Sequence, residues 1–149
     1  MEARLKIETV HPQGIKALYR LEEYLATTSL SSAQKHLIKI RASQVNGCAF
    51  CVNMHTLHAR KDGETEQRLQ LICVWKEAYG IFTPEEQLLF AITEEITLIH
   101  QHGLSDDLYQ KSVQTFGEEQ TAEILMTVII ANAWNRLAIT LHTPPPPQN

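Results

Sequence analysis

The sequence predicts an all-α protein, a bundle of about six to seven helices. Apolar residues recur at steps of three and four along most of the 149-residue chain, as on the buried face of a helix. Capping residues and glycines punctuate these segments. The connections between the segments are short, so we expect consecutive helices to pack against one another.

Helices are expected where a start signal precedes an apolar, periodic segment. Pro12 fits a first helical turn, where its missing N–H costs no hydrogen bond. Ser31 or Ser32, and Thr65, can each cap a helix. Thr83-Pro84-Glu85-Glu86 combines a cap, a proline at the first position and a capping-box glutamate. The expected helices, with their caps, cover about 12–27, 31–47, 48–61, 65–80, 83–103, 105–117 and 119–141.

The two ends of the chain are expected to depart from this pattern. Residues 4–10 alternate weakly, which predicts a short extended arm. The last helix, 119–141, is apolar nearly all round, as is typical of a central helix or a subunit interface. Pro144 to Pro147 begin a proline-rich tail. We therefore expect one domain over 1–143 and an extended, disordered tail over 144–149.

Composition and charge argue against several classes of protein. The apolar fraction of 44% and the net charge of −4 are ordinary, and give no reason to expect nucleic acid or an anionic membrane as partner. No segment approaches the roughly 18–20 apolar residues of a membrane span. The first residues lack the apolar core of a signal peptide, so a cytoplasmic protein is expected. Three cysteines do not make a disulfide scaffold.

The residues with the most distinctive chemistry lie between Gly47 and His55. Cys48 and Cys51 are three apart and His55 follows four later, which places all three on one helix face. The first turn of a helix favours the thiolate, the reactive form of cysteine. His55 lies one turn from Cys51 and can exchange a proton with it. The pair can also close a disulfide, so one cysteine can attack an oxidised substrate and the other resolve the product.

Zinc binding is the main alternative for this stretch. Cys48, Cys51, His55 and His58 are four candidate ligands. On one helix, the first and the last of them lie about 15 Å apart. That span is too long for four ligands to converge on an ion that needs contacts near about 2.0–2.3 Å. Thiol chemistry is therefore favoured, with no metal and no cofactor, while zinc and a pair of buried, inert cysteines stay open as alternatives.

Other residues carry weaker signals. Cys73 falls on the apolar face of its expected helix and is expected in the core. Trp75 and Trp134 are typical of core or interface packing rather than of a ligand site. His58 is expected to be a polar surface or interface residue.

A family resemblance centres on the stretch from Arg41 to His55. This stretch, with its Ser-Gln-x-Asn-Gly lead-in and its Cys-x-x-Cys-x-x-x-His core, resembles the core of the alkylhydroperoxidase D (AhpD)-like family, which is grouped with the carboxymuconolactone decarboxylases. The likeness continues through Ala59 to Glu64 and Asn132 to Leu137, and includes Tyr19 to Leu25. It covers nearly the whole chain.

The resemblance implies an all-helical fold that oligomerises, often as trimers or hexamers, and a thiol-dependent peroxidase or disulfide-reductase activity. It implies that Cys51 attacks the peroxide and that Cys48 resolves the product. The helix-dipole argument alone would activate Cys48 first. We follow the resemblance, because His55 is one turn from Cys51 and two turns from Cys48.

One position departs from the family pattern. The proton relay of the family uses a glutamate twelve residues before the first cysteine, where this chain has His36. No carboxylate replaces it among its neighbours, Gln34, Lys35 and Leu37. A histidine can act as a base near neutral pH, or stabilise a thiolate when it is positive. The decarboxylase branch is less expected, since it does not rely on this thiol pair.

The expected catalytic residues are therefore Cys51, Cys48, His55 and His36. The expected function is an antioxidant peroxidase with a peroxide substrate and an external dithiol or protein reductant, acting as a homo-oligomer (trimer or hexamer). The alternative is a disulfide-exchange adaptor or redox sensor with little peroxide turnover.

Overall fold

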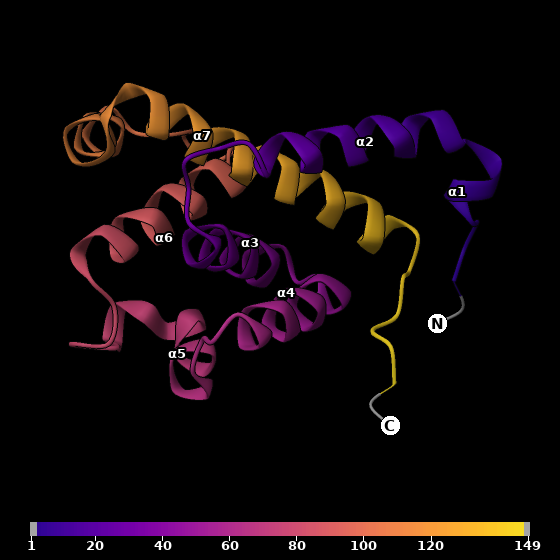
Figure 1. Cartoon of the computed structure of the whole chain (residues 1–149), viewed down its shortest axis with the longest axis horizontal. Coiled ribbons are helices and arrows are strands. Elements are labelled where there is room, and N and C mark those ends of the chain that lie inside the picture. Colours follow the sequence, from indigo (N-terminus) through magenta and orange to yellow (C-terminus); the bar gives the residue numbers. More distant parts are fainter. Residues whose placement is uncertain (1–2, 148–149) are drawn as a thin grey trace.

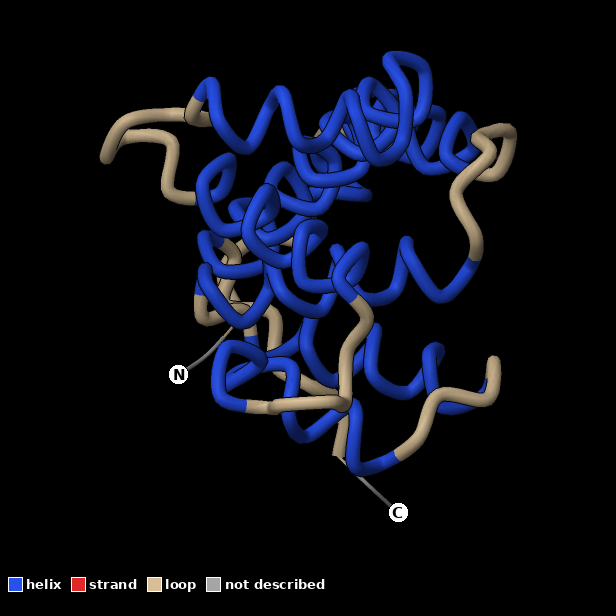
Figure 2. Tube along the Cα trace, turned by 90° about the vertical axis from the view of Figure 1, so that its left-hand side faces the viewer, coloured by secondary structure: helices blue, strands red, loops and turns tan. Residues whose placement is uncertain are grey.

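The computed structural model describes residues 3–147 and contains only helices and connecting loops in that range, which confirms the all-α prediction (Figures 1 and 2). There are seven α-helices and one 3₁₀ segment in the described part of the chain. They are α1 (Ile7–Val10), α2 (Pro12–Leu25), α3 (Ser32–Asn46), α4 (Ala49–Lys61), α5 (Glu66–Leu71), η1 (Ile72–Glu77), α6 (Pro84–Thr97) and α7 (Asp106–Thr140).

Helix α3 is the central element, since it packs against α4, α6 and α7 (Figure 1). Leu37 and Ile40 belong to one apolar cluster, with Phe90 of α6 and residues of α5 and η1. Ile38 belongs to a second cluster, with Ile124 of α7. A helix with apolar side chains on two sides is buried between layers, and α3 separates the two clusters of the core in this way.

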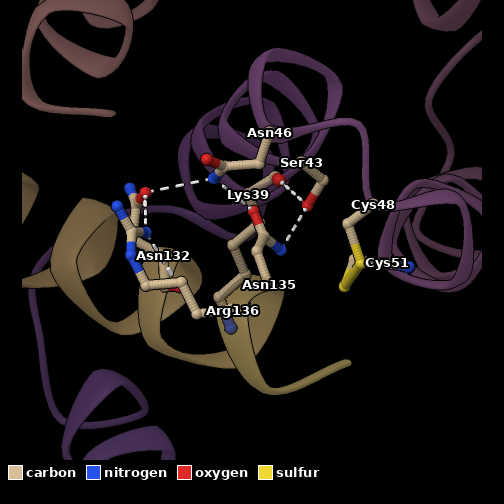
Figure 3. Close-up of a disulfide and its surroundings, with 8 residues drawn as sticks. All are labelled: Lys39, Ser43, Asn46, Cys48, Cys51, Asn132, Asn135 and Arg136. Carbon is tan, nitrogen blue, oxygen red and sulfur yellow. Dashed lines mark hydrogen bonds between the residues drawn. A yellow bond between two sulfur atoms is a disulfide. The ribbon is translucent and has the colours of Figure 1, made fainter. Parts of the chain in front are cut away.

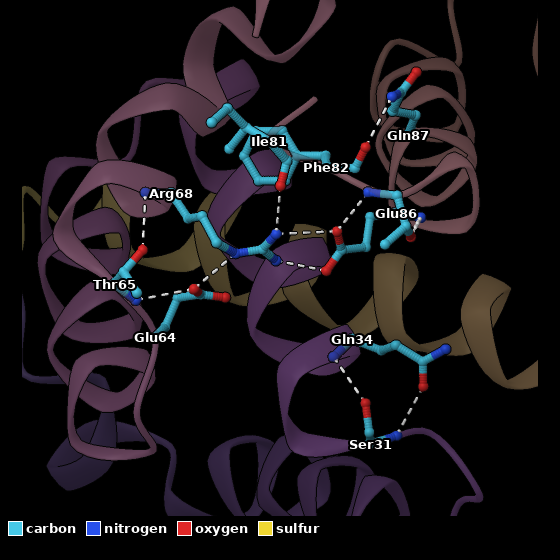
Figure 4. A network of polar contacts seen from close by, with 10 residues as sticks. Ser31, Gln34, Glu64, Thr65, Arg68, Ile81, Phe82, Glu86 and Gln87 are labelled. Carbon is cyan, nitrogen blue, oxygen red and sulfur yellow. Dashed lines mark hydrogen bonds and ion pairs between the residues drawn. The ribbon is translucent and has the colours of Figure 1, made fainter. Parts of the chain in front are cut away.

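The helix starts follow the predicted caps. Ser31 and Gln34 form a complete capping box at α3 (Figure 4). Thr83 and Glu86 form another at α6. Arg68 of α5 then donates to Glu86 and to the Ile81 carbonyl, which ties α5 to the start of α6 (Figure 4). Local sequence signals therefore set where these helices begin, and an ion pair fixes how two of them dock.

Two predicted elements differ in the structure. Residues 4–10 are not an extended arm, because Ile7–Val10 forms one helical turn, α1. Arg4 donates its backbone N–H to the Leu141 carbonyl, at 3.0 Å, so the N-terminal arm lies against the end of α7. The single helix expected over 65–80 is instead a short α-helix, α5, followed by the 3₁₀ segment η1. Within η1, Val74 leaves the helical region at φ −122° and ψ 29°.

Helix α7 bends at Gly117, where two helices were predicted to meet. Gly117 has φ 78° and ψ 169°, a conformation that only glycine adopts readily. Ile129 is 51% exposed, so the second half is not buried all round, in contrast to its apolar sequence. Of the helices described, α7 alone has the length and hydropathy of a membrane span; 44% of that apolar stretch is buried inside the protein, and a core helix meets the same criteria.

The C-terminal tail was expected over 144–149. Its first part, 144–147, is exposed and has no regular secondary structure. Residues 148 and 149 lie outside the described part of the chain.

Candidate active site

The cysteine pair sits at a sharp reversal between α3 and α4. Gly47 adopts the left-handed conformation at φ 71°, and the Cys48 N–H donates to the Ser43 carbonyl at 2.9 Å. These features end α3 in a Schellman motif. Cys48 is then the N-cap of α4, and its Sγ accepts from the Cys51 N–H at 3.3 Å. The predicted stop at Asn46-Gly47 therefore places both sulfurs at the first turn of α4.

Cys48 and Cys51 form a disulfide in the structure (Figure 3). Each residue is only 2% exposed. The three-residue spacing therefore brings the sulfurs together, and the pair is shielded from bulk solvent. An oxidant or reductant must therefore reach the sulfurs through a cavity or hollow beside them.

A buried amide network fixes the reversal against α7 (Figure 3). Asn46 Nδ2 donates to Asn132 Oδ1 at 3.0 Å and to Asn135 Oδ1 at 2.9 Å. Asn135 Nδ2 donates to Ser43 Oγ at 3.0 Å, and Ser43 Oγ donates to the Lys39 carbonyl at 2.7 Å. Buried networks whose members are satisfied rigidify their surroundings. The two motifs of the family resemblance, around Ser43 and around Asn132, thus bind each other.

Cys51 opens onto a partly enclosed cavity of about 540 Å³. Helices α2, α3, α4 and α7 form its walls. The apolar wall consists of Leu25, Phe50, Met54, Trp134, Leu137 and Leu141. The ring of Trp134 packs on Tyr19 of α2, with the ring centroids 5.2 Å apart. Trp134 was expected in core or interface packing; it also lines a cavity large enough for a ligand.

His55 lies in the same cavity, one turn after Cys51, and is 7% exposed. Burial, with smaller contributions from Lys39, His58 and His36, lowers the pKa of His55 from 6.5 to about 3. The imidazole is therefore neutral near pH 7. It can be protonated transiently during a proton transfer, but it does not stay protonated at this pH.

The structure brings His36 into this cavity with the other predicted residues. The sequence neighbours of His36 offered no carboxylate, but the structure supplies one. Asp62 Oδ2 is 2.7 Å from His36 Nε2. A second carboxylate, Glu22, pairs with Lys39 at 2.6 Å, and both of these residues line the cavity.

Sequence reasoning missed Asp62, Lys39 and Glu22, although some signals were present. Asp62 follows His55 by seven residues, so two helical turns place it on the same face of α4. Lys39 follows His36 by three residues on α3. The position of Glu22 depends on how α2 packs across the bundle, which the sequence pattern does not specify.

Cys48 faces a different space from Cys51. It lines a shallow, open hollow together with Cys73, and neither residue lines the cavity. The prediction that Cys73 lies in the core is wrong, since it is a free, exposed cysteine. It lies in the 3₁₀ segment, next to the distorted Val74, so the periodicity of an α-helix does not describe its orientation.

Comparison with known proteins decides the family. Residues 12–95, more than half of the chain, match the family model of the carboxymuconolactone decarboxylase family. The chain belongs to this family. An uncharacterised protein of Bacillus subtilis (strain 168), YdfG, is 38% identical over 141 residues, which are 95% of each chain.

Solved structures show that this member of the family has the AhpD-like fold. A protein of unknown function from Agrobacterium tumefaciens, described as a putative antioxidant defence protein AhpD, is 34% identical with a TM-score of 0.94, covering 99% of this chain and 100% of its own. A peroxidase-related protein from Ralstonia eutropha, described as an AhpD core, shares the fold alone at 15% identity, with a TM-score of 0.80 and coverage of 93% and 74%. The family name refers to a decarboxylase, whereas these descriptions refer to antioxidant defence and to a peroxidase-related protein. The activity of this chain must therefore be argued from its site.

Proposed function

We propose that this protein is a thiol-dependent peroxidase with an antioxidant role, in which Cys51 attacks the peroxide and Cys48 resolves the product. The observation that carries the proposal is the position of Cys51. It is bonded to Cys48, and it opens onto a cavity that also contains His55 in a neutral state. A nucleophile, a proton acceptor and a space for the substrate therefore adjoin one another.

The reaction begins from the reduced pair. The Cys51 thiolate, at the first turn of α4, attacks the O–O bond of the peroxide and becomes a sulfenic acid. Cys48 condenses with the sulfenic acid, water leaves, and the disulfide forms. An external dithiol or a protein thiol then reduces the disulfide through a mixed disulfide.

The shape of the cavity supports an organic peroxide as substrate. Its exposed lining is mainly apolar, with an aromatic wall from Phe50 and Trp134. Apolar cavities of about 300–1,000 Å³ are typical of small-molecule sites. His55, with help from His36, moves the protons in this proposal.

The experiment is a turnover assay with hydrogen peroxide and cumene hydroperoxide, with dithiothreitol as reductant. We expect turnover by the wild type, faster with cumene hydroperoxide, and none by Cys51→Ser. Cys73→Ser is the matched control, because it removes the free thiol outside the cavity and should keep full activity. Retained turnover in Cys51→Ser would contradict the proposal.

A second candidate function is disulfide exchange with a protein partner, as an adaptor or redox sensor. The observation that favours it is the open hollow on the Cys48 side, which a partner thiol can approach without entering the cavity. Slow peroxide turnover together with fast exchange against a thioredoxin would favour this function over the peroxidase.

The proposal also covers the localisation, the subunit number and the domain bounds of the enzyme. We propose a cytoplasmic homo-oligomer, a trimer or hexamer, with residues 1–143 as its functional domain. Exposed apolar side chains on α2 and α7 support association; they are Tyr19, Leu21, Tyr24, Ile129 and Ile139. Light scattering on the purified protein counts the subunits, and a monomer would contradict this part.

A further inference from the structure

Asp62 lies at the C-terminal end of α4 and pairs with a histidine of α3. Its Oδ2 is 2.7 Å from Nε2 of His36, and both residues line the cavity that contains Cys51 and His55. We infer that Asp62 is a positioning residue for peroxide reduction, which holds His36 in the state that takes up the Cys51 proton. This inference rests on the proposed function, and it assigns the proton to a residue pair drawn from two helices.

The contact selects one tautomer of His36. A carboxylate only accepts hydrogen bonds, so the Nε2 that faces Asp62 must carry the hydrogen when the imidazole is neutral. Nδ1 is then the nitrogen with a free lone pair, and it is the atom that can accept a proton. In serine hydrolases, a carboxylate selects the tautomer of the catalytic histidine by a contact of the same kind.

His55 cannot perform this task alone. Burial and neighbouring positive groups lower the pKa of His55 to about 3, so a proton on it has no stable place near pH 7. The His36 side chain is 17% exposed and has Asp62 as its acidic partner. The two histidines therefore have different roles, in which His55 passes the proton and His36 holds it.

The surrounding charges leave Asp62 as the partner of His36. The charged and titratable groups that line the cavity around this pair are Glu8 of α1, Tyr19 and Glu22 of α2, Lys35 and Lys39 of α3, and Cys51, His55 and His58 of α4. Among the described residues, α7 contributes no ionisable side chain to this wall. Glu22 pairs with Lys39 at 2.6 Å, and Lys35 Nζ donates to the Leu25 carbonyl at 3.0 Å.

Protons and electrons balance over the peroxide step. The Cys51 thiol gives its proton to His36 Nδ1 through His55 and water, and becomes a thiolate. The thiolate attacks a peroxide oxygen, the S–O bond forms and the O–O bond breaks. Sulfur loses two electrons, and the peroxide gains them to leave as an alkoxide. The imidazolium of His36 returns the proton to the alkoxide, which departs as the alcohol.

Kinetics of Asp62→Asn, His36→Gln and the double variant test the inference. We expect each single variant to lower kcat/KM for cumene hydroperoxide by about tenfold, and the double variant to lose no more, because the residues act as one unit. Losses that multiply in the double variant would overturn the inference.

Two controls separate this role from a structural one. The Asp62 side chain is 53% exposed, so its ion pair adds little to stability and Asp62→Asn should keep the wild-type Tm. Asp107→Asn removes another exposed carboxylate, which pairs with Lys111 at 2.7 Å, and should leave kcat/KM and its pH profile unchanged. Equal losses in both variants would overturn the inference.

A spectroscopic measurement tests the inference without turnover. The ¹⁵N shifts of His36 report which ring nitrogen carries the hydrogen, and we expect Nε2. In Asp62→Asn we expect this preference for Nε2 to be lost. Hydrogen on Nδ1 in the wild type would overturn the inference. Hydrogen on Nε2 without any peroxide turnover would refute the proposed function and leave the pairing of Asp62 with His36 intact.

Discussion

The two sulfurs of the disulfide are equally buried but face different surroundings. Cys51 faces a partly enclosed cavity with an apolar wall and proton-handling groups, whereas Cys48 faces a shallow, open hollow that it shares with Cys73. Solvent exposure of 2% for each residue does not distinguish them. The comparison teaches that the neighbours of a thiol, and the space in front of it, can assign roles that burial alone cannot.

The largest expected effect comes from replacing each of the two cysteines in turn. Cys51→Ser should lower the rate of peroxide reduction by about 10³-fold or more, since the nucleophile is lost. Cys48→Ser should keep the first turnover at nearly the wild-type rate, because only the resolving step is lost. Stopped-flow measurement of peroxide consumption over one turnover checks both. Equal loss of the first turnover in the two variants would contradict the assignment of roles.

The second effect concerns His55 in the cavity next to Cys51, and it appears in the pH dependence of the free energy of unfolding. The folded protein holds the pKa of His55 at about 3, against 6.5 for an unperturbed histidine. As pH falls from 6.5 towards 3, His55 becomes protonated in the unfolded chain but stays neutral in the folded protein. The free energy of unfolding therefore decreases over this range, by at most about 5 kcal/mol.

Urea denaturation of the disulfide form between pH 7 and pH 4 measures this decrease. His55→Gln, which cannot titrate, should lose less stability over the same range than the wild type. His102→Gln, an exposed histidine of the loop before α7, is the control and should behave as the wild type does. The same acid response in His55→Gln and in the wild type would show that burial of His55 is not its source.

The third effect tests the support shared by both sides of the disulfide. Asn135 is fully buried, accepts from Asn46 and donates to Ser43. Asn135→Ala leaves buried polar groups without partners and should lower the free energy of unfolding by about 2–3 kcal/mol. For a protein of this size, the Tm should fall by roughly 4–10 °C. Gln114→Ala, an exposed position of α7, should change the Tm little; an equal fall in both variants would argue against the network.

The smallest effect is expected from the tail. Deletion of residues 144–149 should leave the Tm and kcat/KM within error of the wild type, because residues 144–147 are exposed and the cavity wall ends at Thr143. Thermal denaturation and the turnover assay check this expectation. A clear loss of activity would show that the functional domain extends beyond residue 143.

The sequence predicts the parts of the fold that local signals control. Ser31, Thr65 and Thr83 mark the helix starts that the structure shows, and Gly47 marks the stop before the cysteines. The four-residue spacing of Cys51 and His55 likewise places both on the side of α4 that lines the cavity, whereas Cys48, the N-cap, faces the open hollow. These features depend on neighbours a few residues apart, which is why the sequence alone specifies them.

Features that depend on packing could not be predicted in this way. His36 and Asp62 meet because α3 and α4 pack antiparallel after the reversal at Gly47, and they are 26 residues apart in the chain. Cys73 is exposed because Val74 interrupts the helix beside it, while its apolar neighbours in the sequence suggested burial. In both cases the local pattern is compatible with several environments, and the tertiary structure selects one.

The central claim is that Cys51, rather than Cys48, is the residue that peroxide oxidises. The most direct test treats reduced Cys48→Ser and reduced Cys51→Ser with one equivalent of cumene hydroperoxide and traps sulfenic acid with dimedone for mass spectrometry. We predict rapid labelling of Cys51 in Cys48→Ser and none of Cys48 in Cys51→Ser. Labelling of Cys48 at an equal or greater rate would contradict the account.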